Sequence, residues 1–333
     1  RGVAVTLIDK SAPGSGCSGS SFSWINATYP KKPYSYNLFS QLGMNAFHLV
    51  QGELSLDIKW NGSLEWASKI GDQQTLIESV NELQNYPKYT ATSIIGYKKA
   101  KKLEPYINFK GNENIVFSKA DGAINPKDAI SKMINAIKKN GGKVLYPCKF
   151  EKVIESNDLF SKVKTSMGVL KSENIIFCNG VDVDKSLNIN FLKEPRPGVI
   201  IKTKPKKNLI NSIVYGPNIH AHQQSNGQLI IGEQITAPTE QNSLNHLKRI
   251  NKHFKNMVRG ASDLNPSEVL IGLRPIPKDD LPVIGRFKNK SIYVAVMHSG
   301  ISLAAIVGNL VTQEIVDEVD SLLLNDFRPS RFF

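Results

Sequence analysis

A nearly continuous apolar run lies close to the N-terminus, at residues 3–8 (VAVTLI), and ends at Asp9. A short run of this kind is typical of a parallel β-strand that is buried on both faces of a sheet. Parallel strands are joined by crossover helices, so the run predicts an α/β fold. A buried parallel strand also needs a neighbour on each side. We therefore expect a further strand, glycine turn and helix that would precede Arg1.

The loop after this strand contains Gly14, Gly16 and Gly19, which match the GxGxxG pattern of dinucleotide-binding turns. In that fingerprint the glycines follow the strand directly, and an acidic residue about 20 positions later binds the ribose. Here four residues separate Asp9 from Gly14, and no Asp or Glu occurs between Asp9 and Glu53. We interpret Asp9 itself as the ribose-binding acid, at the end of the second strand of a Rossmann unit. The alternative is a solvated carboxylate at a strand end.

Hydrophobic periodicity and capping residues predict most of the remaining elements. Helices are expected at residues 34–54, 68–85, 125–140, 243–258 and 300–317, with a short helix after the small-residue loop 10–21. Strands are expected at residues 143–146, 150–155, 162–165, 175–178 and 291–296, of which 175–178 and 291–296 are predicted to be buried. The strands at 198–203, 220–223 and 227–232 have the pattern of a half-exposed antiparallel sheet that walls a substrate chamber.

The formal charge of +13 comes from 34 lysines and only 8 arginines. A nucleic-acid-binding protein gathers its charge into an arginine-rich stripe interleaved with aromatic residues. Here the densest runs, 98–102, 138–143 and 202–207, are scattered over predicted helix ends and loops. We interpret them as solvated surface, with weak attraction of an anionic ligand or surface as the alternative, and expect no nucleic-acid partner. The longest strongly apolar stretch, residues 300–311, is too short to span a membrane.

Cysteine and histidine spacing narrows the class of protein further. Cys17, Cys148 and Cys178 form neither a CxxC pair nor an even disulfide framework, which favours a reducing cytoplasmic compartment. His220 and His222 lie two residues apart, so they share one face of a strand, a spacing that also occurs in metal sites. No nearby Cys, Asp or Glu completes such a site, and we expect no metal.

Residues 272–285 (GLRPIPKDDLPVIG) form the most informative segment of the chain. The prolines and glycines predict a defined loop that holds Arg274 in an apolar frame. A guanidinium fixed in this way is suited to bind a carboxylate through two parallel hydrogen bonds. The alternative is a structural ion pair between Arg274 and Asp279 or Asp280.

A sharp strand-to-helix turn follows at residues 297–300 (MHSG). Small residues at such a turn let a ligand approach the backbone, and the free amides and dipole of the helix favour negative charge there. The alternative is ordinary packing between a strand and a helix.

Taken together, these segments resemble the FAD-dependent amino-acid and amine oxidoreductases, the family that includes D-amino-acid oxidase, glycine oxidase and sarcosine oxidase. The resemblance rests on residues 5–9, 13–27, 121–122 with the helix from 125, 175–180, 272–285, 298–304 and 327–332. It implies a Rossmann-like FAD-binding domain with a parallel central sheet, interleaved with an α+β substrate domain built on an antiparallel sheet. The FAD-binding domain would comprise residues 1–45, 115–190 and 268–333, and the substrate domain 46–114 and 191–267.

The resemblance also implies site residues. Asp9 would hold the adenosine ribose, the small-residue loop would line the pyrophosphate and flavin, and the turn at His298 would face the flavin pyrimidine. The implied FAD-binding residues are Asp9, Lys10, Cys17, Ser18, Ser21, Phe22, Ser23, Phe150, Asn179, Gly180, His298, Ser299, Gly300, Ile301, Ser302 and Leu303. Arg274 would bind the substrate carboxylate, and His220 falls where glycine oxidase has a substrate-side tyrosine.

The implied reaction is oxidation of the C–N bond of a small amino acid or N-substituted amine, by hydride transfer to flavin N5 and hydrolysis of the imine. Oxygen or a membrane quinone would accept the electrons. We assign no general base, and for His298 a structural and a catalytic role stay open. Without the glycine turn that cradles the pyrophosphate, the sequence as it stands is expected to bind FAD weakly.

Two alternatives have other functions. One is a non-catalytic or regulatory protein with the FAD-binding fold, and the other is a subunit of a multi-subunit amine dehydrogenase. The presence of both Arg274 and the His298 turn favours an active enzyme. We expect a cytoplasmic location or, for a dehydrogenase, one peripheral to the inner membrane.

Overall fold

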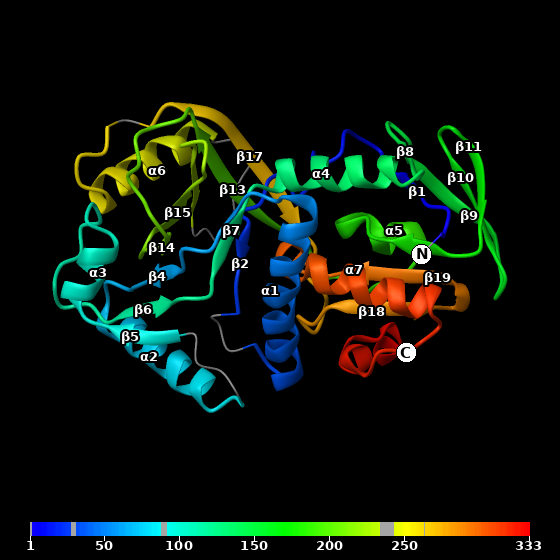
Figure 1. Cartoon of the computed structure of the whole chain (residues 1–333), viewed down its shortest axis with the longest axis horizontal. Helices are drawn as coiled ribbons and strands as arrows, with labels where there is room; N and C mark the ends of the chain where they lie inside the picture. The colour runs from blue at the N-terminus through cyan, green and yellow to red at the C-terminus, as the bar shows by residue number, and fades with distance from the viewer. Residues whose placement is uncertain (1, 28–30, 88–91, 234–242, 263) are drawn as a thin grey trace.

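The computed structural model describes residues 2–27, 31–87, 92–233, 243–262 and 264–333. The largest sheet has eight strands. Figure 1 shows this sheet and α6 on one side of the molecule, and α7 with several strands of the smaller sheets on the other. The helix α1 (Tyr34–Leu54) lies between them. None of the helices in the described ranges is both long and apolar enough to cross a membrane.

The large sheet has the strand order β17-β13-β16-β15-β14-β4-β6-β5. The strands are β17 (Pro266–Arg274), β13 (Arg196–Thr203), β16 (Leu229–Glu233), β15 (Ile219–Gln223), β14 (Ile213–Tyr215), β4 (Ser63–Glu65), β6 (Ile115–Ser118) and β5 (Thr92–Ile95). All neighbours are antiparallel except β14 and β4. The predicted antiparallel pairing of the strands near 200, 220 and 230 is therefore confirmed.

The prediction that these strands are half exposed is wrong. The β16 residues are all buried, as are all the β15 residues except His220. Helix α6 (Ser243–Met257) covers one face, where Ile250 and Phe254 join the core formed by Ala221, Ile231 and their neighbours. The small-residue loop covers the other face, as described below. The sheet is thus covered on both sides at β15 and β16, whereas most residues of edge strand β17 are exposed.

Several strands of the smaller sheets lie on the side of α7 (Gly300–Val316). Strand β1 (Thr6–Ile8) pairs in parallel with β8 (Lys143–Leu145), and β12 (Ile175–Phe177) pairs in parallel with β19 (Asn289–Val296). The remaining strands are β2 (Trp24–Ile25), β3 (Ile58–Lys59), β7 (Gly122–Ile124), β9 (Phe150–Ser156), β10 (Ser161–Thr165), β11 (Gly168–Ser172) and β18 (Val283–Phe287). The strands β1, β8, β9, β18 and β19 lie on the side of α7, whereas β2 and β7 lie beside α1 (Figure 1). The predicted parallel character of the N-terminal strand is confirmed.

Burial at the open edges of these sheets differs from the prediction. Val3 and Val5 are 55% and 50% exposed, and Ile176 is 44% exposed, although each was expected inside a sheet. Within the described residues, β1 has only β8 as a neighbour and β12 has only β19. An apolar strand is buried on both faces only where neighbouring elements cover it, so these side chains face solvent here.

The other helices are α2 (Ile70–Gln84), α3 (Tyr97–Leu103), α4 (Pro126–Lys139) and α5 (Val183–Leu187). As predicted, Asn125 caps α4, since its side chain accepts a hydrogen bond from the Asp128 amide. Helix α1 packs closely on α7 at Gly43, where a Cβ atom would lie 2.7 Å from the Ser302 carbonyl oxygen. The expected short helix after residues 10–21 does not form; residues 10–21 are turns and bends, and the chain continues into strand β2 at Trp24.

The C-terminal residues fold back onto α7 in two short 3-10 helices, Leu322–Phe327 and Pro329–Phe332. The buried carboxylate of Glu314 anchors them. It accepts hydrogen bonds from both terminal nitrogens of Arg328, at 2.7 and 2.5 Å, from the Tyr293 hydroxyl at 2.6 Å and from the Ser321 amide at 2.8 Å.

Candidate functional site

One face of the large sheet points away from α6. We call this face the chamber wall, after the substrate chamber that the sequence predicts. The pairing register places Arg274 opposite Arg196, Gly272 opposite Gly198, and His220 opposite Gly232. Because side chains alternate along a strand, these residues share one face. On strands β17, β13, β16, β15 and β14 this face carries Glu268, Leu270, Gly272, Arg274, Arg196, Gly198, Ile200, Lys202, Ile230, Gly232, His220, His222 and Tyr215.

The second half of the small-residue loop and the residues that follow it, 16–24, lie against this wall. A Cβ atom on Gly272 would lie 3.2 Å from the Ser20 Cβ and 3.5 Å from the Cys17 sulfur, so the loop packs closely on this point of β17. The Phe22 ring makes edge contacts with the rings of His220 and His222, with centroids 4.3 and 5.0 Å apart. The loop that the family resemblance assigns to the flavin is therefore in direct contact with the predicted substrate side.

Arg274 is the last residue of β17 rather than part of the predicted loop, because Gly272 and Arg274 still pair with β13. Its Nε donates to the Arg196 carbonyl at 3.2 Å and its Nη2 to the Pro197 carbonyl at 3.0 Å. The guanidinium lies over Gly198, where a Cβ atom would be 3.4 Å from Nη2. Two backbone carbonyls and a glycine thus direct it along the wall.

The alternative ion pair of Arg274 does not form. Asp279 binds Arg331, with N–O distances of 2.6 and 3.0 Å, and Asp280 binds Lys193 at 2.8 Å. In the described part of the chain, Arg274 has no carboxylate partner. Burial lowers the pKa of Arg274 somewhat, yet a guanidinium stays charged in proteins. The site therefore contains a half-buried cation whose acidic neighbours are already paired.

His220 stands beside Arg274 on the wall. Its ring stacks on Tyr215, with centroids 5.1 Å apart and planes at 11°, and a Cβ atom on Gly232 would overlap it. Burial, then His222 and Arg274, lower the pKa of His220 to about 3, so the ring is neutral. Its Nδ1 is buried and has no hydrogen-bond partner among the described residues. The other nitrogen, Nε2, lies over Gly232.

His222 connects the wall to the loop. Its Nε2 is 2.9 Å from the Phe22 carbonyl oxygen. A carbonyl only accepts, so Nε2 carries the hydrogen and donates it. Burial lowers the pKa of His222 to about 4, which keeps the ring neutral. His222 therefore holds the loop in place through a neutral hydrogen bond.

The low pKa of His222 predicts a pH-dependent stability. In the folded chain this group binds its proton only near pH 4, whereas in the unfolded chain it does so near pH 6.5. The stabilisation is therefore present above about pH 6.5 and is lost as the pH falls toward about 4. A His222→Gln substitution keeps a donor for Phe22 and removes the titration. Urea unfolding measures the free energy of unfolding at each pH. Between pH 7 and pH 4.5 its slope against pH should correspond to about one proton fewer taken up on unfolding in this variant than in the wild type. Identical slopes would contradict the assignment.

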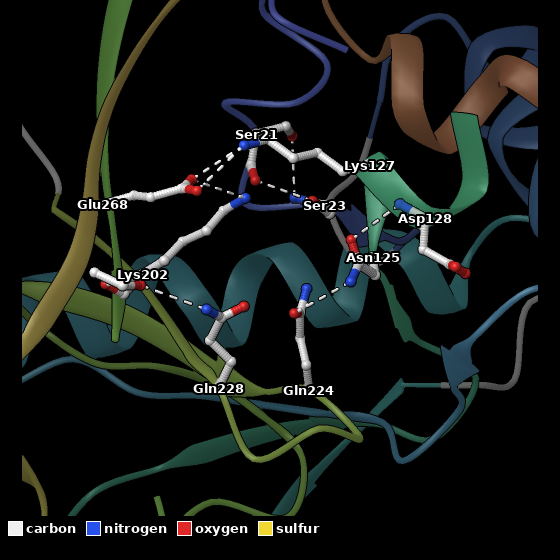
Figure 2. Close-up of polar contacts among 10 residues, drawn as sticks. Ser21, Ser23, Asn125, Lys127, Asp128, Lys202, Gln224, Gln228 and Glu268 are labelled. Atoms are coloured by element: carbon white, nitrogen blue, oxygen red, sulfur yellow. Dashed lines mark hydrogen bonds and ion pairs between the residues drawn. The ribbon is translucent and has the colours of Figure 1, made fainter. Parts of the chain in front are cut away.

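The opposite end of the wall contains an ion-pair cluster that joins it to α4. The Glu268 carboxylate is 3.1 Å from the Lys127 ammonium of α4 and 3.8 Å from the buried Lys202 ammonium of β13. Figure 2 shows this cluster together with the turn at Ser21 and Ser23. In that turn the Ser23 amide donates to the Ser21 hydroxyl at 3.0 Å, and Ser23 has a left-handed φ of 63°.

The predicted turn between β19 and α7 is present, with His298 and Ser299 before the helix. The N-cap residue Ser299 forms no side-chain cap among the described residues, and the first turn of α7 contains no acidic residue, an arrangement that suits its backbone amides to binding a negatively charged group. A Cβ atom on Gly300 would meet nothing within 4 Å, which leaves space in front of these amides. The Ser302 hydroxyl donates to the Trp24 carbonyl at 3.0 Å and Leu303 is buried, so these two contribute backbone rather than side chains.

His298 is close to three cations. Burial lowers its pKa to about 4, and Arg274, Lys31 and Arg196 add to the decrease. Lys31 lies over the Tyr36 ring, and the Tyr36 hydroxyl is 3.2 Å from the Ser299 hydroxyl. The α7 turn and the Arg274 end of the wall therefore face one positively charged region.

The residues predicted to hold the adenosine side lie at the carboxyl ends of β1 and β12. Asp9 accepts a hydrogen bond from the Ser11 amide at 2.9 Å, and Lys10, after β1, forms an ion pair with Asp182, after β12. Gly180 also follows β12, and Asn179 donates to Ser186 at 2.7 Å. Phe150 begins β9, and its ring packs on Phe177 with centroids 5.2 Å apart. The structure thus brings the carboxyl ends of β1 and β12 close to each other.

Several wall residues could not be identified from the sequence. Arg196, Gly198, Tyr215 and Gly232 join the site only through cross-strand pairing, and the register is not visible in any one segment. Cys17 is a free thiol whose pKa is raised by burial, with Arg274 acting in the opposite direction. No group of three or more potential metal ligands occurs in the part of the chain that the structure describes.

Comparison with known proteins identifies the class that this fold and site define. The family model described as FAD dependent oxidoreductase matches residues 1–314, and the chain belongs to this family. FAD is the cofactor of the family, so the resemblance found in the sequence is confirmed. No curated protein matches the sequence significantly.

Solved structures share the fold. Glycine oxidase from Geobacillus kaustophilus is 16% identical, with a TM-score of 0.87 over 98% of this chain and 91% of that one. L-proline dehydrogenase from P. horikoshii is 20% identical, with a TM-score of 0.87 over 100% and 92%. L-α-glycerophosphate oxidase from Mycoplasma pneumoniae, solved with FAD bound, is 16% identical, with a TM-score of 0.77 over 93% and 88%.

Proposed function

We propose that this chain oxidises the C–N bond of a small amino acid or N-substituted amine, with FAD as the hydride acceptor at N5 and water hydrolysing the resulting imine. The observation that carries this proposal is the Arg274 guanidinium. It has no acidic partner in the described residues and is directed along a wall that faces the predicted flavin loop. A carboxylate-bearing substrate would complete this pairing.

The wall residues have distinct roles in this proposal. The Arg274 nitrogens that are not bound to β13 would hold the substrate carboxylate and fix the position of the adjacent carbon. His220 is neutral, and its ring, which packs on Tyr215 and over Gly232, would present an uncharged surface to the substrate. Phe22 and Tyr215 would exclude water around the carbon that loses the hydride. Oxygen or a quinone stays our prediction for the electron acceptor.

The proton chemistry follows from the histidines. Hydride transfer requires a neutral amine, so a proton must leave the substrate ammonium first. His220, His222 and His298 have pKa values of about 3, 4 and 4, which makes them poor proton acceptors. We therefore assign no general base and expect the substrate to react as the minor neutral amine present at neutral pH.

The residues present fit FAD at both ends. The first-turn amides of α7 would face the pyrimidine edge, where the reduced ring carries negative charge. Asp9, at the carboxyl end of β1, has one carboxylate oxygen bound to Ser11 and would offer the other to the ribose. The small-residue loop contains Gly16, where a Cβ atom would meet nothing within 4 Å.

We also infer that the FAD-binding sheet takes a further parallel strand between β1 and β12. Each is parallel to its one neighbour among the described strands, and their carboxyl ends are joined by the Lys10–Asp182 ion pair. The apolar side chains of Val5 and Ile176 are exposed on these strands. A strand followed by a glycine turn would cover them and would supply the amides that cradle the pyrophosphate.

The experiment that tests the proposal is anaerobic reduction of bound flavin. A strand–glycine turn–helix segment would be joined to this chain, and the purified protein would be examined for a flavin spectrum. Addition of amino acids and N-methyl amines should bleach that spectrum and release the carbonyl product of imine hydrolysis, an oxo acid or an aldehyde, together with ammonia or an amine. A protein that binds no flavin, or flavin that no amine bleaches, would refute the proposal.

A further inference from the structure

Two arginines face each other at one end of the chamber wall. Arg196 and Arg274 are directly opposite on the antiparallel strands β13 and β17, so their side chains leave the sheet on the same face. Like charges in directly opposite positions destabilise a sheet. Arg196 also lowers the pKa of Arg274, as expected for two neighbouring cations. This pair is therefore unfavourable unless a negatively charged group lies between them.

The protein does not supply that group in its described residues. The nearby carboxylates of Asp279 and Asp280 are bound to Arg331 and Lys193. Arg196 is exposed, and neither arginine forms an ion pair within the described ranges. The Arg196 carbonyl accepts a hydrogen bond from Arg274, so the backbone at Arg196 orients one guanidinium while its side chain provides the second.

The two guanidiniums differ in their surroundings. Arg274 is half buried over Gly198 and extends toward His220, whereas Arg196 is exposed at the rim. A ligand in the chamber would reach Arg274 with the end that carries the reacting amine. A second anionic group on the same ligand, pointing outward, would reach Arg196.

We propose that Arg196 is a specificity-determining residue that binds a second carboxylate, so that the preferred substrates are dicarboxylic amino or imino acids. This inference rests on the proposed amine oxidation and adds the substrate class. The α-carboxylate binds Arg274, and the second carboxylate binds Arg196 and relieves the repulsion between the two cations. Because Arg196 is exposed, water and salt weaken its contribution, which we expect to be about tenfold in affinity.

The test compares two secondary amines that differ by one carboxylate, N-methylglycine and iminodiacetate. Rapid-mixing measurements of anaerobic flavin reduction give an apparent dissociation constant for each. Arg196→Gln should raise the constant for iminodiacetate about tenfold and that for N-methylglycine far less, and Arg196→Lys should restore part of the loss. Arg259→Gln, which changes an exposed arginine outside the wall, is the matched control and should alter neither constant.

A second measurement does not depend on turnover. Malonate and acetate differ in the same way, and their binding is followed by the change they cause in the flavin spectrum. The proposal expects tighter malonate binding that Arg196→Gln abolishes. Equal effects of Arg196→Gln on one and two carboxylates would overturn it. Should no amine reduce the flavin while malonate still binds through Arg196, the amine oxidation fails and the dicarboxylate site stands.

Discussion

Replacing Arg274 with alanine is expected to lower kcat/KM for carboxylate-bearing amines by about 100- to 1,000-fold. The change removes a charge-assisted, two-point contact with the substrate in a half-buried site, a loss of about 3 to 4 kcal/mol of transition-state stabilisation. Arg274 forms no ion pair in the described structure that could explain such a loss through folding. Steady-state kinetics with matched amines that have or lack the carboxylate measure the effect.

The control for this variant is the substrate itself. An amine without a carboxylate cannot use Arg274, so its kcat/KM should change by a few-fold at most. Arg274→Lys keeps the charge without the planar pair of donors and should recover only part of the activity. Equal losses for both kinds of amine would show that Arg274 has a structural role.

Replacing Glu314 with alanine is expected to destabilise the folded chain by about 3 to 5 kcal/mol, the largest stability effect that we predict. The variant leaves Arg328 and the Tyr293 hydroxyl without the carboxylate that binds them. Chemical unfolding measures the loss. Glu155→Ala is the matched control, because Glu155 pairs with Lys162 at the surface and should contribute less than about 1 kcal/mol.

The pH dependence of the Glu314 contribution has a defined sign. Burial favours the neutral form, but the hydrogen bonds from Arg328, Tyr293 and Ser321 and the charge of Arg328 together outweigh it and lower the pKa of Glu314 below 4.5. The stabilisation is thus fully present above about pH 4.5 and is lost as the pH falls through the folded-state pKa. Wild type and Glu314→Ala should therefore converge in stability at acidic pH. A constant difference at all pH values would contradict this account.

Local signals predicted much of the fold. Asn125 and the glycines near 141 define α4 within one short segment, and the periodicity of residues 34–54 gives α1 with the observed bounds. The MHSG turn is likewise where strand β19 meets α7. These features depend on residues adjacent in the chain, so the sequence alone was sufficient for them.

Long-range packing could not be predicted in this way. Arg274 is held by carbonyls of Arg196 and Pro197, which lie more than 70 positions earlier and reach it only through the register of β13 and β17. The fit of His220 over Gly232 depends in the same way on β15 and β16. Burial of the N-terminal strand was overestimated because it depends on which neighbours are present, and the apolar pattern of Val3 and Val5 does not specify them.

The central claim, that this FAD-dependent oxidoreductase acts on a C–N bond, is tested most directly with one pair of substrates. N-methylglycine and glycolate each carry a carboxylate that Arg274 would bind, but only the first has nitrogen on the reacting carbon. A structural neighbour is named as a glycerophosphate oxidase, so the fold alone does not decide between the two. Under anaerobic conditions N-methylglycine should bleach the flavin of the FAD-loaded protein and glycolate should not. Bleaching by glycolate, with no reaction of the amine, would contradict the account.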